Sequence, residues 1–302
     1  MHAESLNPEI PAGDIRRPIG VMAGWGRLPF AVAQALRKQG RRVVGVGIRD
    51  HADPRLAELC EQFDWIGVGG IGRGIRLLRG WGVTEAAMAG KVHKTMFLRR
   101  GWWLRHFPDW TCIKAFYPQL LTGSKDRKDD TLLGTLVAAY ARGGITFLSA
   151  TDFAPELLVK AGQIVGRPLT AKQKKDVEFG WQIAKEMGQI DVGQSVCVKD
   201  QAVIAVEAIE GTDACIQRAG QLCEANGFTV VKVAKPQQDM RWDVPTVGVQ
   251  TLETIAKAGG RVLAIEAGRT FLLDDQDFRQ AAQQLKVSVV ALDESSVAEA
   301  AA

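Results

Sequence analysis

The segment from residue 19 to residue 48 constrains the fold most, because it reads as a strand, a glycine loop, a helix and a second strand. Ile19–Ala23 is a short apolar run, and a loop with two glycines follows it. Pro29 then stands at the first position of a predicted helix, where its fixed φ and missing N–H are tolerated. Arg42–Ile48 is a second apolar run. A strand–helix–strand unit of this kind predicts a parallel sheet.

The same alternation continues along the chain and predicts two α/β domains. A length of 302 residues suits two domains of ordinary size. Prolines and glycines cluster near residues 150–168, where we expect the boundary. We therefore expect a disordered tail at 1–17, a Rossmann-like domain with a parallel sheet at 18–155, and a second α/β domain at 156–302.

Hydrophobic patterns and turn residues place the remaining predicted elements. A hairpin is expected around Lys199–Gln201. The further predicted strands are Trp65–Val68, Ala86–Ala89, Ser195–Val198, Ala202–Glu207, Thr229–Ala234 and Val262–Ile265. The further predicted helices are Gly74–Arg79, Thr131–Arg142, a helix capped by Thr170 that ends at Met187, Asp213–Cys223 and Thr251–Ala258.

Composition and charge exclude several classes of protein. Apolar residues make up 46% and charged residues 24% of the chain, so overall disorder is not expected. The net charge of +4 suits an anionic ligand but falls short of the basic face of a nucleic-acid binder. No run of about 18 apolar residues occurs, and the start of the chain lacks the features of a signal peptide. The five scattered cysteines predict reduced thiols in a cytoplasmic protein, without a disulfide framework or zinc site.

The loop Gly24–Pro29 is the first candidate site. Glycines between a strand and a helix let the backbone approach a phosphate, and the helix N-terminus offers free N–H groups. Two alternatives stay open: a tight turn without a ligand, and a dinucleotide loop in which Asp50 contacts a ribose. Pro29 replaces the third glycine of the dinucleotide fingerprint, which weakens the last alternative.

The second candidate is the charged segment that ends in Lys128, Asp129 and Asp130, just before an apolar helix. Carboxylates there cap a helix well. The alternative is that Asp129 and Asp130 hold a divalent cation while Lys128 or Arg127 holds phosphate, because Mg²⁺ needs few carboxylates when phosphate oxygens and waters complete its shell.

The third candidate is Glu207–Asp213, where a strand ends and a helix begins. Acidic residues at the carboxyl ends of strands face the region where α/β domains bind ligands. Thr212 or Asp213 capping the helix is the structural alternative.

The fourth candidate is the polar loop Lys235–Pro245, which has prolines near both ends. Lys235 and Arg241 suit phosphate oxygens. Asp243 suits a metal ion or the orientation of an attacking water. A solvated loop is the alternative.

Three tryptophans lie close together at Trp102, Trp103 and Trp110, beside Arg99, Arg100 and Arg105. Tryptophan and arginine favour membrane interfaces and apolar ligand mouths. Packing in the core is the alternative explanation of this segment, and it is slightly favoured over a lipid contact.

Seven segments in this order resemble one family, the LpxI-type UDP-2,3-diacylglucosamine pyrophosphatases of lipid A biosynthesis. The resemblance covers about residues 18–293. The matching segments are Ala23–Pro29, Ala89–Val92, Lys128–Leu133, Gly188–Gln194, Glu207–Asp213, Arg241–Gly248 and Glu266–Arg269. Trp25 departs from the family pattern, in which a small residue is common, and the Trp102–Trp110 stretch matches no family segment.

The resemblance implies two α/β domains that bind a lipid-linked UDP-sugar between them and hydrolyse its diphosphate to UMP and 2,3-diacylglucosamine 1-phosphate. It implies dependence on Mg²⁺ or another divalent cation, with Asp243 as the catalytic residue. It also implies a cytoplasmic protein with peripheral contact to the inner membrane surface and no nucleic-acid partner, while a homodimer stays open. The expected substrate-binding residues are Gly24, Trp25, Gly26, Gly90, Lys91, Lys128, Asp129, Asp130, Gln194, Lys235 and Arg241, and the expected metal ligands are Asp129, Asp130, Glu207 and Asp213.

Two other functions remain open from the sequence. The first domain suits a dinucleotide-dependent oxidoreductase, and the whole chain suits a nucleotide-binding module without chemistry. Binding of NAD without phosphate release would favour the former, and binding of a UDP-sugar without turnover would favour the latter.

Overall fold

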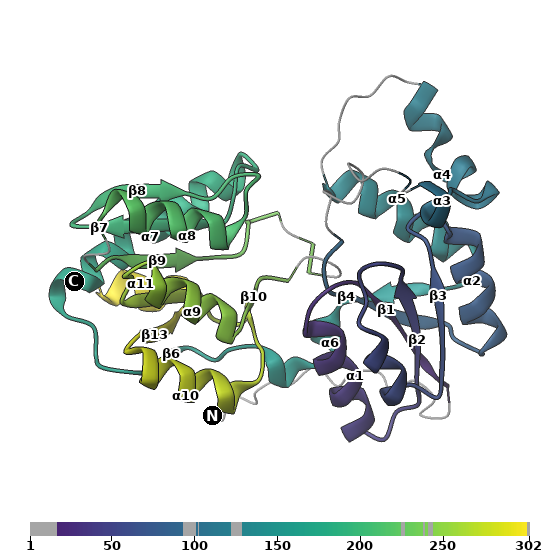
Figure 1. Cartoon of the computed structure of the whole chain (residues 1–302), viewed down its shortest axis with the longest axis horizontal. Helices are drawn as coiled ribbons and strands as arrows, with labels where there is room; N and C mark the ends of the chain where they lie inside the picture. The colour runs from purple at the N-terminus through teal and green to yellow at the C-terminus, as the bar shows by residue number, and fades with distance from the viewer. Residues whose placement is uncertain are drawn as a thin grey trace, which may run out of the picture. The chain divides into compact units, whose positions relative to one another are not determined.

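The computed structural model describes residues 17–92, 101, 103–121, 129–224, 227–237, 239–240 and 244–300. These residues form two compact units. One reaches Pro155 and includes Met240, and the other comprises Glu156–Asp239 and the residues from Val244 onward. Each unit alternates strands and helices, so the prediction of an α/β protein with two domains is confirmed (Figure 1).

A five-stranded parallel sheet forms the centre of the first unit. Its order is β3-β2-β1-β4-β5, so the chain moves outward from β1 to β3 and then crosses back to β4, beside β1. Open α/β sheets bind ligands where the strand order reverses, which here is the carboxyl ends of β1 and β4. The strands are β1 (Ile19–Ala23), β2 (Val43–Ile48), β3 (Gln62–Ile66), β4 (Glu85–Ala89) and β5 (Thr146–Leu148).

Helices pack on this sheet and bury its apolar strands. All five residues of β1 are buried, as expected for an inner strand of a parallel sheet. Helix α1 packs on β1 and against α6, whereas α2, α4 and α5 share one apolar core with the sheet. The helices are α1 (Leu28–Lys38), η1 (Pro54–Leu59), α2 (Ile71–Gly80), α3 (Trp103–His106), α4 (Trp110–Leu121), α5 (Asp129–Arg142) and α6 (Ala150–Phe153).

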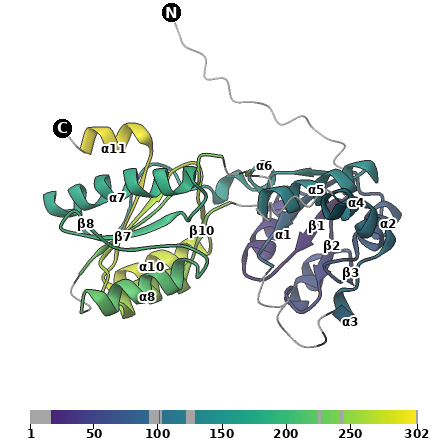
Figure 2. The same ribbon diagram turned by 90° about the horizontal axis from the view of Figure 1, so that it is seen from above.

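The second unit is built on a six-stranded mixed sheet of order β6-β13-β11-β9-β7-β8. Strands β9, β11 and β13 are parallel, while β6, β7 and β8 run antiparallel to their neighbours. Helices α7 and α11 cover one face and α8 and α10 the other (Figure 2). The strands are β6 (Gly162–Val165), β7 (Ser195–Lys199), β8 (Ala202–Val206), β9 (Thr229–Lys232), β11 (Val262–Glu266) and β13 (Ser288–Leu292).

The remaining elements of this unit complete its layers. A separate two-stranded parallel sheet joins β10 (Thr246–Val247) to β12 (Phe271–Leu272). The predicted cap of α7 is confirmed, because Thr170 accepts from the N–H of Gln173 in a capping box. The helices are η3 (Pro155–Leu157), α7 (Ala171–Gln189), α8 (Thr212–Leu222), α9 (Val249–Lys257), α10 (Asp275–Leu285) and α11 (Glu294–Ala300).

Some predicted elements were misplaced or missed. Strand β3 begins at Gln62, three residues before the predicted start, because it is an edge strand and needs no continuous apolar run. Helix α10 was not predicted, although Phe278, Ala281, Ala282 and Leu285 recur at helical spacing on the core side, because its other residues are all polar. Helix α4 was not predicted because its aromatic residues and Pro118 are not typical of a helix interior. Short strands such as β5, β6 and β12 lack enough residues to show a period.

Candidate functional site

The glycine loop after β1 and the loop after β4 are joined by the backbone. The N–H of Trp25 donates to the carbonyl of Lys91 at 2.7 Å, and the N–H of Lys91 donates back to Trp25 at 2.9 Å. Gly24 and Gly90 permit this approach, since a Cβ on either would lie 2.7 Å from a backbone oxygen of the other loop. The structure therefore brings four of the predicted substrate-binding residues together where the strand order reverses.

The N-terminus of α1 follows this loop directly. Arg27 occupies its N-cap position but its side chain does not cap the helix, and Pro29 lies in the first turn. Gly26 has a φ of +109°, a conformation that favours glycine, and a Cβ there would meet no atom within 4 Å. The loop thus combines open space with a helix N-terminus, the two features that an anion site requires.

Asp50, the ribose contact of the dinucleotide alternative, is held by the α3 segment. Its carboxylate accepts from Arg105 at 3.0 Å and lies 3.2 Å from Nε2 of His106. The N–H of Val68 donates to Nδ1 of His106, so Nε2 carries the proton that Asp50 accepts. The hydrogen bond from His106, followed by that from Arg105, lowers the pKa of Asp50. This arrangement gives Asp50 a structural task in anchoring α3.

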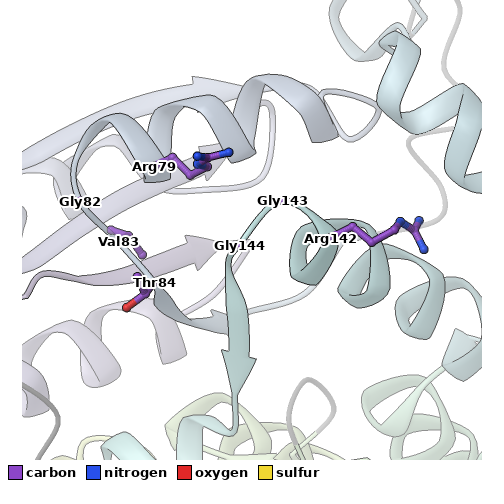
Figure 3. A pocket seen from close by; sticks show the side chains of 7 residues that line it. All are labelled: Arg79, Gly82, Val83, Thr84, Arg142, Gly143 and Gly144. Atoms are coloured by element: carbon purple, nitrogen blue, oxygen red, sulfur yellow. The ribbon is translucent and has the colours of Figure 1, made fainter.

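A cavity of about 410 Å³ lies in the first unit between the turns that precede β4 and β5 (Figure 3). Arg79 and Arg142 extend from the last turns of α2 and α5 beside it. Basic residues at helix C-termini offset the negative end of the helix dipole, which explains both arginines without a ligand. The cavity lies at the amino ends of the strands, the edge opposite the glycine loop.

A buried polar cluster lies in the second unit, where β8 ends and α8 begins. Thr212 donates its hydroxyl proton to Oε1 of Glu207 at 3.0 Å and accepts from Nζ of Lys232 at 3.2 Å. Ser195 lies 3.4 Å from the same hydroxyl and must be the donor, because Thr212 has one proton. Glu207, Lys232 and Ser195 are 8%, 4% and 0% exposed. The four residues form a chain of hydrogen bonds from an ammonium to a carboxylate.

This cluster corrects the capping explanation of the Glu207–Asp213 segment. The N-cap of α8 is Gly211, with a φ of +86°, and no side chain caps the helix in the described part of the chain. Thr212 and Asp213 are already helical, so their side chains project away from the cap position. Thr212 instead connects two buried charges, and Asp213 accepts from Gln250 at 3.4 Å.

Two buried acceptors near this cluster have no hydrogen-bond partner among the described residues: Oε2 of Glu207 and Oε1 of Gln194. The two residues are linked through the sheet, because Gln194 precedes Ser195 and the N–H of Glu207 donates to the carbonyl of Ser195. A buried acceptor without a donor costs free energy, so such atoms indicate a missing donor or cation.

The described residues fit a divalent cation only in part. No three histidine, cysteine or acidic side chains gather in the portion of the chain that the structure describes. Oε2 of Glu207 provides one oxygen ligand in a buried place. That is enough for Mg²⁺ when phosphate and water supply the other ligands, so Glu207 fits the ion that the family implies.

The predicted site residue Lys235 makes an ion pair, and so does Glu266, which lies in a segment that resembles the family. Lys235 contacts Asp191 at 2.6 Å, at the carboxyl end of β9. Glu266, at the end of β11, accepts from Lys185 at 2.7 Å and from the N–H of Ala234 at 2.7 Å. Both oxygens of Glu266 are thus used, and the residue ties α7 to the sheet.

Several predicted site residues lie outside the described residues, among them Lys128, Arg241, Asp243 and Trp102. Helix α5 begins at Asp129, two residues before the predicted start, and the side chains of Asp129, Asp130 and Trp103 lie outside the described residues, so both explanations of this segment stay predictions.

Helix α4 presents an apolar face to solvent. Trp110, Ile113 and Tyr117 are 67%, 36% and 54% exposed, and the spacing of three and four residues places them on one side. Lys114 lies over the ring of Trp110 at 5.5 Å. The core explanation of the tryptophan segment is therefore wrong for Trp110. We call Trp110, Ile113, Lys114 and Tyr117 the α4 face.

Sequence reasoning missed Lys232 and His106. Lys232 ends an apolar strand, and a lysine in that position was a usable signal, since a buried charge requires a partner. His106 gave no such signal, because its partner Asp50 lies 56 residues away.

The comparisons with known proteins place the chain in one family. Residues 18–157 match the LpxI N-terminal domain, and residues 160–290 match the LpxI C-terminal domain. The chain belongs to the LpxI family. A relative from Caulobacter vibrioides, UDP-2,3-diacylglucosamine pyrophosphatase LpxI, is 30% identical over 284 residues, which cover 92% of this chain and 98% of that protein.

Solved structures resemble this LpxI-family chain only distantly. The Bordetella bronchiseptica enzyme WbmH in complex with NAD⁺ is 9% identical, with a TM-score of 0.32, over 94% of this chain and 78% of that one. A biotin carboxylase domain of a thermophilic 2-oxoglutarate carboxylase is 11% identical, with a TM-score of 0.26, over 68% of this chain and 32% of that one. Similarity at this level carries no argument about fold or function.

Proposed function

We propose that this protein hydrolyses the diphosphate of UDP-2,3-diacylglucosamine, giving UMP and 2,3-diacylglucosamine 1-phosphate. The observation that carries the proposal is the match of both LpxI domains, together with 30% identity to a relative of that named activity over nearly its whole length.

The chemistry of the described residues supports a diphosphate substrate. Attack on a phosphorus adds negative charge to its oxygens, so the site needs cations and aimed N–H donors more than a covalent nucleophile. The first unit offers the loop Gly24–Gly26 at the N-terminus of α1, with Lys91 tied beside it. The second unit offers Lys232 and the N-terminus of α8.

A divalent cation, with Mg²⁺ the first candidate, belongs to this proposal. Oε2 of Glu207 is the described oxygen best suited to hold it. Asp129, Asp130 and Asp213 are the further candidates from the sequence. A bound Mg²⁺ would neutralise charge on the diphosphate, while Thr212 keeps the Glu207 carboxylate in place.

Asp243 is the residue we propose as catalytic, on the motif position that it occupies in the family. Arg241, Lys128, Gln194 and Lys235 are proposed to contact the substrate. The ion pair of Lys235 with Asp191 is compatible with this, because a lysine ammonium has three donors.

The α4 face is proposed to contact the membrane that supplies this two-chain lipid, on the cytoplasmic face of the inner membrane. None of the described helices is long and apolar enough to span a bilayer. The segment from Lys94 to Tyr117 contains five lysines and arginines and one acidic residue, Asp109, whose carboxylate accepts from the N–H of Cys112 in α4. Exposed Trp and Tyr beside basic residues suit an anionic lipid surface. The alternative is that a second copy of the chain covers the α4 face in a homodimer.

Incubation of the purified protein with UDP-2,3-diacylglucosamine and Mg²⁺ tests the proposal, with release of UMP as the expected result. UDP-N-acetylglucosamine, which lacks the two long acyl chains, is the matched substrate control and should be hydrolysed far more slowly. Binding of the lipid substrate without release of UMP would instead support the binding-module function, and tight binding of NAD without phosphate release would support the oxidoreductase.

A further inference from the structure

Three large apolar side chains are exposed on two loops of the second unit. Ile190 and Val192, between α7 and β7, are 73% and 42% exposed, and Ile209, between β8 and α8, is 98% exposed. One exposed apolar side chain needs no explanation, but several on neighbouring loops mark a contact surface. We call Ile190, Val192 and Ile209 the apolar cluster.

The two loops adjoin each other at one edge of the sheet. Strands β7 and β8 are antiparallel neighbours, so the loop that enters β7 and the loop that leaves β8 lie at the same edge. Gly193 approaches Glu207 so closely that a Cβ on the glycine would lie 2.1 Å from the Glu207 carbonyl oxygen. The carboxyl ends of the parallel strands β9 and β11 are at this edge too, which is where α/β domains bind ligands.

Hydrogen bonds hold both loops in this form. The side-chain amide of Gln237 donates to the carbonyl of Gly188 at 2.8 Å, in the turn that leads to the first loop. In the second loop, the N–H of Ala208 donates to the carboxylate of Glu210 at 3.1 Å. The exposure of the apolar cluster is therefore built into the turns and does not come from a loop without internal contacts.

The acidic side chains beside the apolar cluster are paired. Asp191 contacts Lys235 at 2.6 Å, and Glu210 contacts Arg218 at 2.5 Å. An anionic lipid surface attracts basic residues, yet segments 188–193 and 207–211 contain no lysine or arginine. What these loops offer a partner is aliphatic carbon, which suits an apolar ligand better than a charged surface.

The proposed substrate provides an apolar ligand at this edge. Its acyl groups leave carbons 2 and 3 of the sugar, beside the carbon 1 that carries the diphosphate. Two residues proposed for the polar part of the substrate and its cation flank the cluster in sequence, because Gln194 follows Val192 by two positions and Glu207 precedes Ile209 by two. A diphosphate bound by these residues leaves the acyl chains within reach of the apolar cluster.

We infer that Ile190, Val192 and Ile209 contact an acyl chain of the substrate and so select a diacylated UDP-sugar over one with short acyl groups. This inference rests on the proposed function, to which it adds the residues that recognise the apolar part of the substrate. The apolar cluster lies wholly in the second unit.

The dependence of turnover on acyl-chain length tests this inference. The wild type should prefer UDP-2,3-diacylglucosamine to an analogue with two butanoyl groups. In Ile190→Ser/Ile209→Ser, the ratio of kcat/KM for the long-chain over the short-chain substrate should fall about 10–100-fold, because only the long chain covers these side chains. An unchanged ratio overturns the inference.

Two further variants control this comparison. Val203→Ser/Leu222→Ser removes two exposed apolar side chains of the same unit outside the two loops, and its ratio should equal that of the wild type. Ile190→Leu/Ile209→Leu keeps the aliphatic surface and should preserve the ratio. A ratio that falls as far in the Leu variant as in the Ser variant would show that the loops respond to any substitution, and would overturn the inference.

Vesicles without substrate distinguish an acyl chain of the substrate from a membrane surface. The inference predicts that anionic vesicles capture Ile190→Ser/Ile209→Ser as well as the wild type, and that light scattering gives both the same particle size. Reduced capture would assign the apolar cluster to the membrane, and a smaller particle would assign it to a second copy of the chain. Either result overturns the inference.

Binding of 2,3-diacylglucosamine 1-phosphate, measured without turnover, separates this inference from the proposed function. A wild type that releases no UMP but binds this lipid more tightly than the Ser variant would refute the function and keep the acyl contact. A wild type that releases UMP with the same chain-length ratio as the Ser variant would keep the function and refute the acyl contact.

Discussion

Trp25 and Lys91 exchange two backbone hydrogen bonds, of 2.7 and 2.9 Å, across the carboxyl ends of β1 and β4. The two residues are 66 positions apart in the sequence, yet their loops form one surface at the point where the strand order reverses. Gly24 and Gly90 allow the contact because neither has a Cβ to collide with the opposite backbone. The two glycines therefore have a structural role of their own, beside the phosphate contact that we propose for this loop.

Gly90→Ala should separate the two loops. Gly90 has a φ of +88°, and a Cβ would lie 2.7 Å from the carbonyl oxygen of Trp25. We expect KM for the lipid substrate to rise at least about fivefold, because the loop can no longer hold the arrangement that we propose to bind phosphate. Steady-state kinetics with the folded variant measures this.

Gly82→Ala is the matched control for backbone strain. Gly82 has a φ of +79°, but a Cβ there meets no atom within 4 Å, and the residue lies at the opposite edge of the sheet. Both variants should lose about 1–2 kcal/mol of the free energy of unfolding from the left-handed conformation. Equal KM values for the two variants would show that the backbone hydrogen bonds between Trp25 and Lys91 have no part in substrate binding.

Asp243→Asn should remove most of the turnover. A carboxylate that holds Mg²⁺ or takes a proton from water acts mainly in the transition state, so kcat should fall about 10²–10⁴-fold while KM changes little. Asp239→Ala, in the same loop but outside the strongest motif match, should be milder. An Asn variant that keeps its activity but melts at a lower temperature would show that Asp243 only shapes the loop and has no catalytic role.

Chelation should abolish turnover and added Mg²⁺ should restore it. Oε2 of Glu207 is a buried oxygen without a donor among the described residues, and a diphosphate carries negative charge that a cation offsets. UMP release in EDTA, followed by titration with Mg²⁺, measures the requirement. Full turnover in excess chelator would exclude a divalent cation from the reaction.

Replacing apolar residues of the α4 face should weaken membrane binding. Trp110→Ser/Tyr117→Ser removes two exposed aromatic side chains, and flotation with anionic vesicles should capture clearly less of this variant than of the wild type. Val203→Ser/Leu222→Ser removes two exposed apolar side chains of the second unit and is the matched control. Equal capture, together with a smaller particle in light scattering, would assign the face to a second copy of the chain.

Lys185→Met should destabilise the second unit. The Glu266 side chain is 6% exposed and accepts from Lys185 at 2.7 Å, so the variant removes its nearest counter-charge and leaves only Arg269, at 4.0 Å, among the described residues. Breaking such a pair costs about 3–5 kcal/mol. Lys185→Met/Glu266→Gln should recover part of the loss in denaturant unfolding, and a single variant as stable as the wild type would show that the pair contributes nothing.

The sequence predicted those parts of the fold that local patterns control. Ile19–Ala23 is apolar throughout because it is an inner parallel strand, and its bounds were correct. Thr170 begins a capping box, which four consecutive residues determine. The edge strand β3 was misplaced because only Ile66 of its residues is fully buried. Helix α10 was missed although Phe278, Ala281, Ala282 and Leu285 recur at helical spacing, so the helical pattern itself was present in the sequence.

The candidate site was predictable only where glycine or an acidic motif marked it. The Trp25–Lys91 bridge follows from the order of strands, which no local pattern contains. The link from Lys232 through Thr212 to Glu207 joins three segments and was equally hidden. Residues that act through tertiary contacts leave no spacing in the sequence, so a structure is needed to find them.

Product analysis in ¹⁸O-labelled water tests the central claim most directly. The purified protein is incubated with UDP-2,3-diacylglucosamine and Mg²⁺, and both products are weighed by mass spectrometry. Our account predicts UMP and 2,3-diacylglucosamine 1-phosphate in equal amounts, with one ¹⁸O atom in one of the two; label in UMP assigns attack to the α-phosphorus. Absence of UMP, or products without label, would contradict hydrolysis of the diphosphate by this protein.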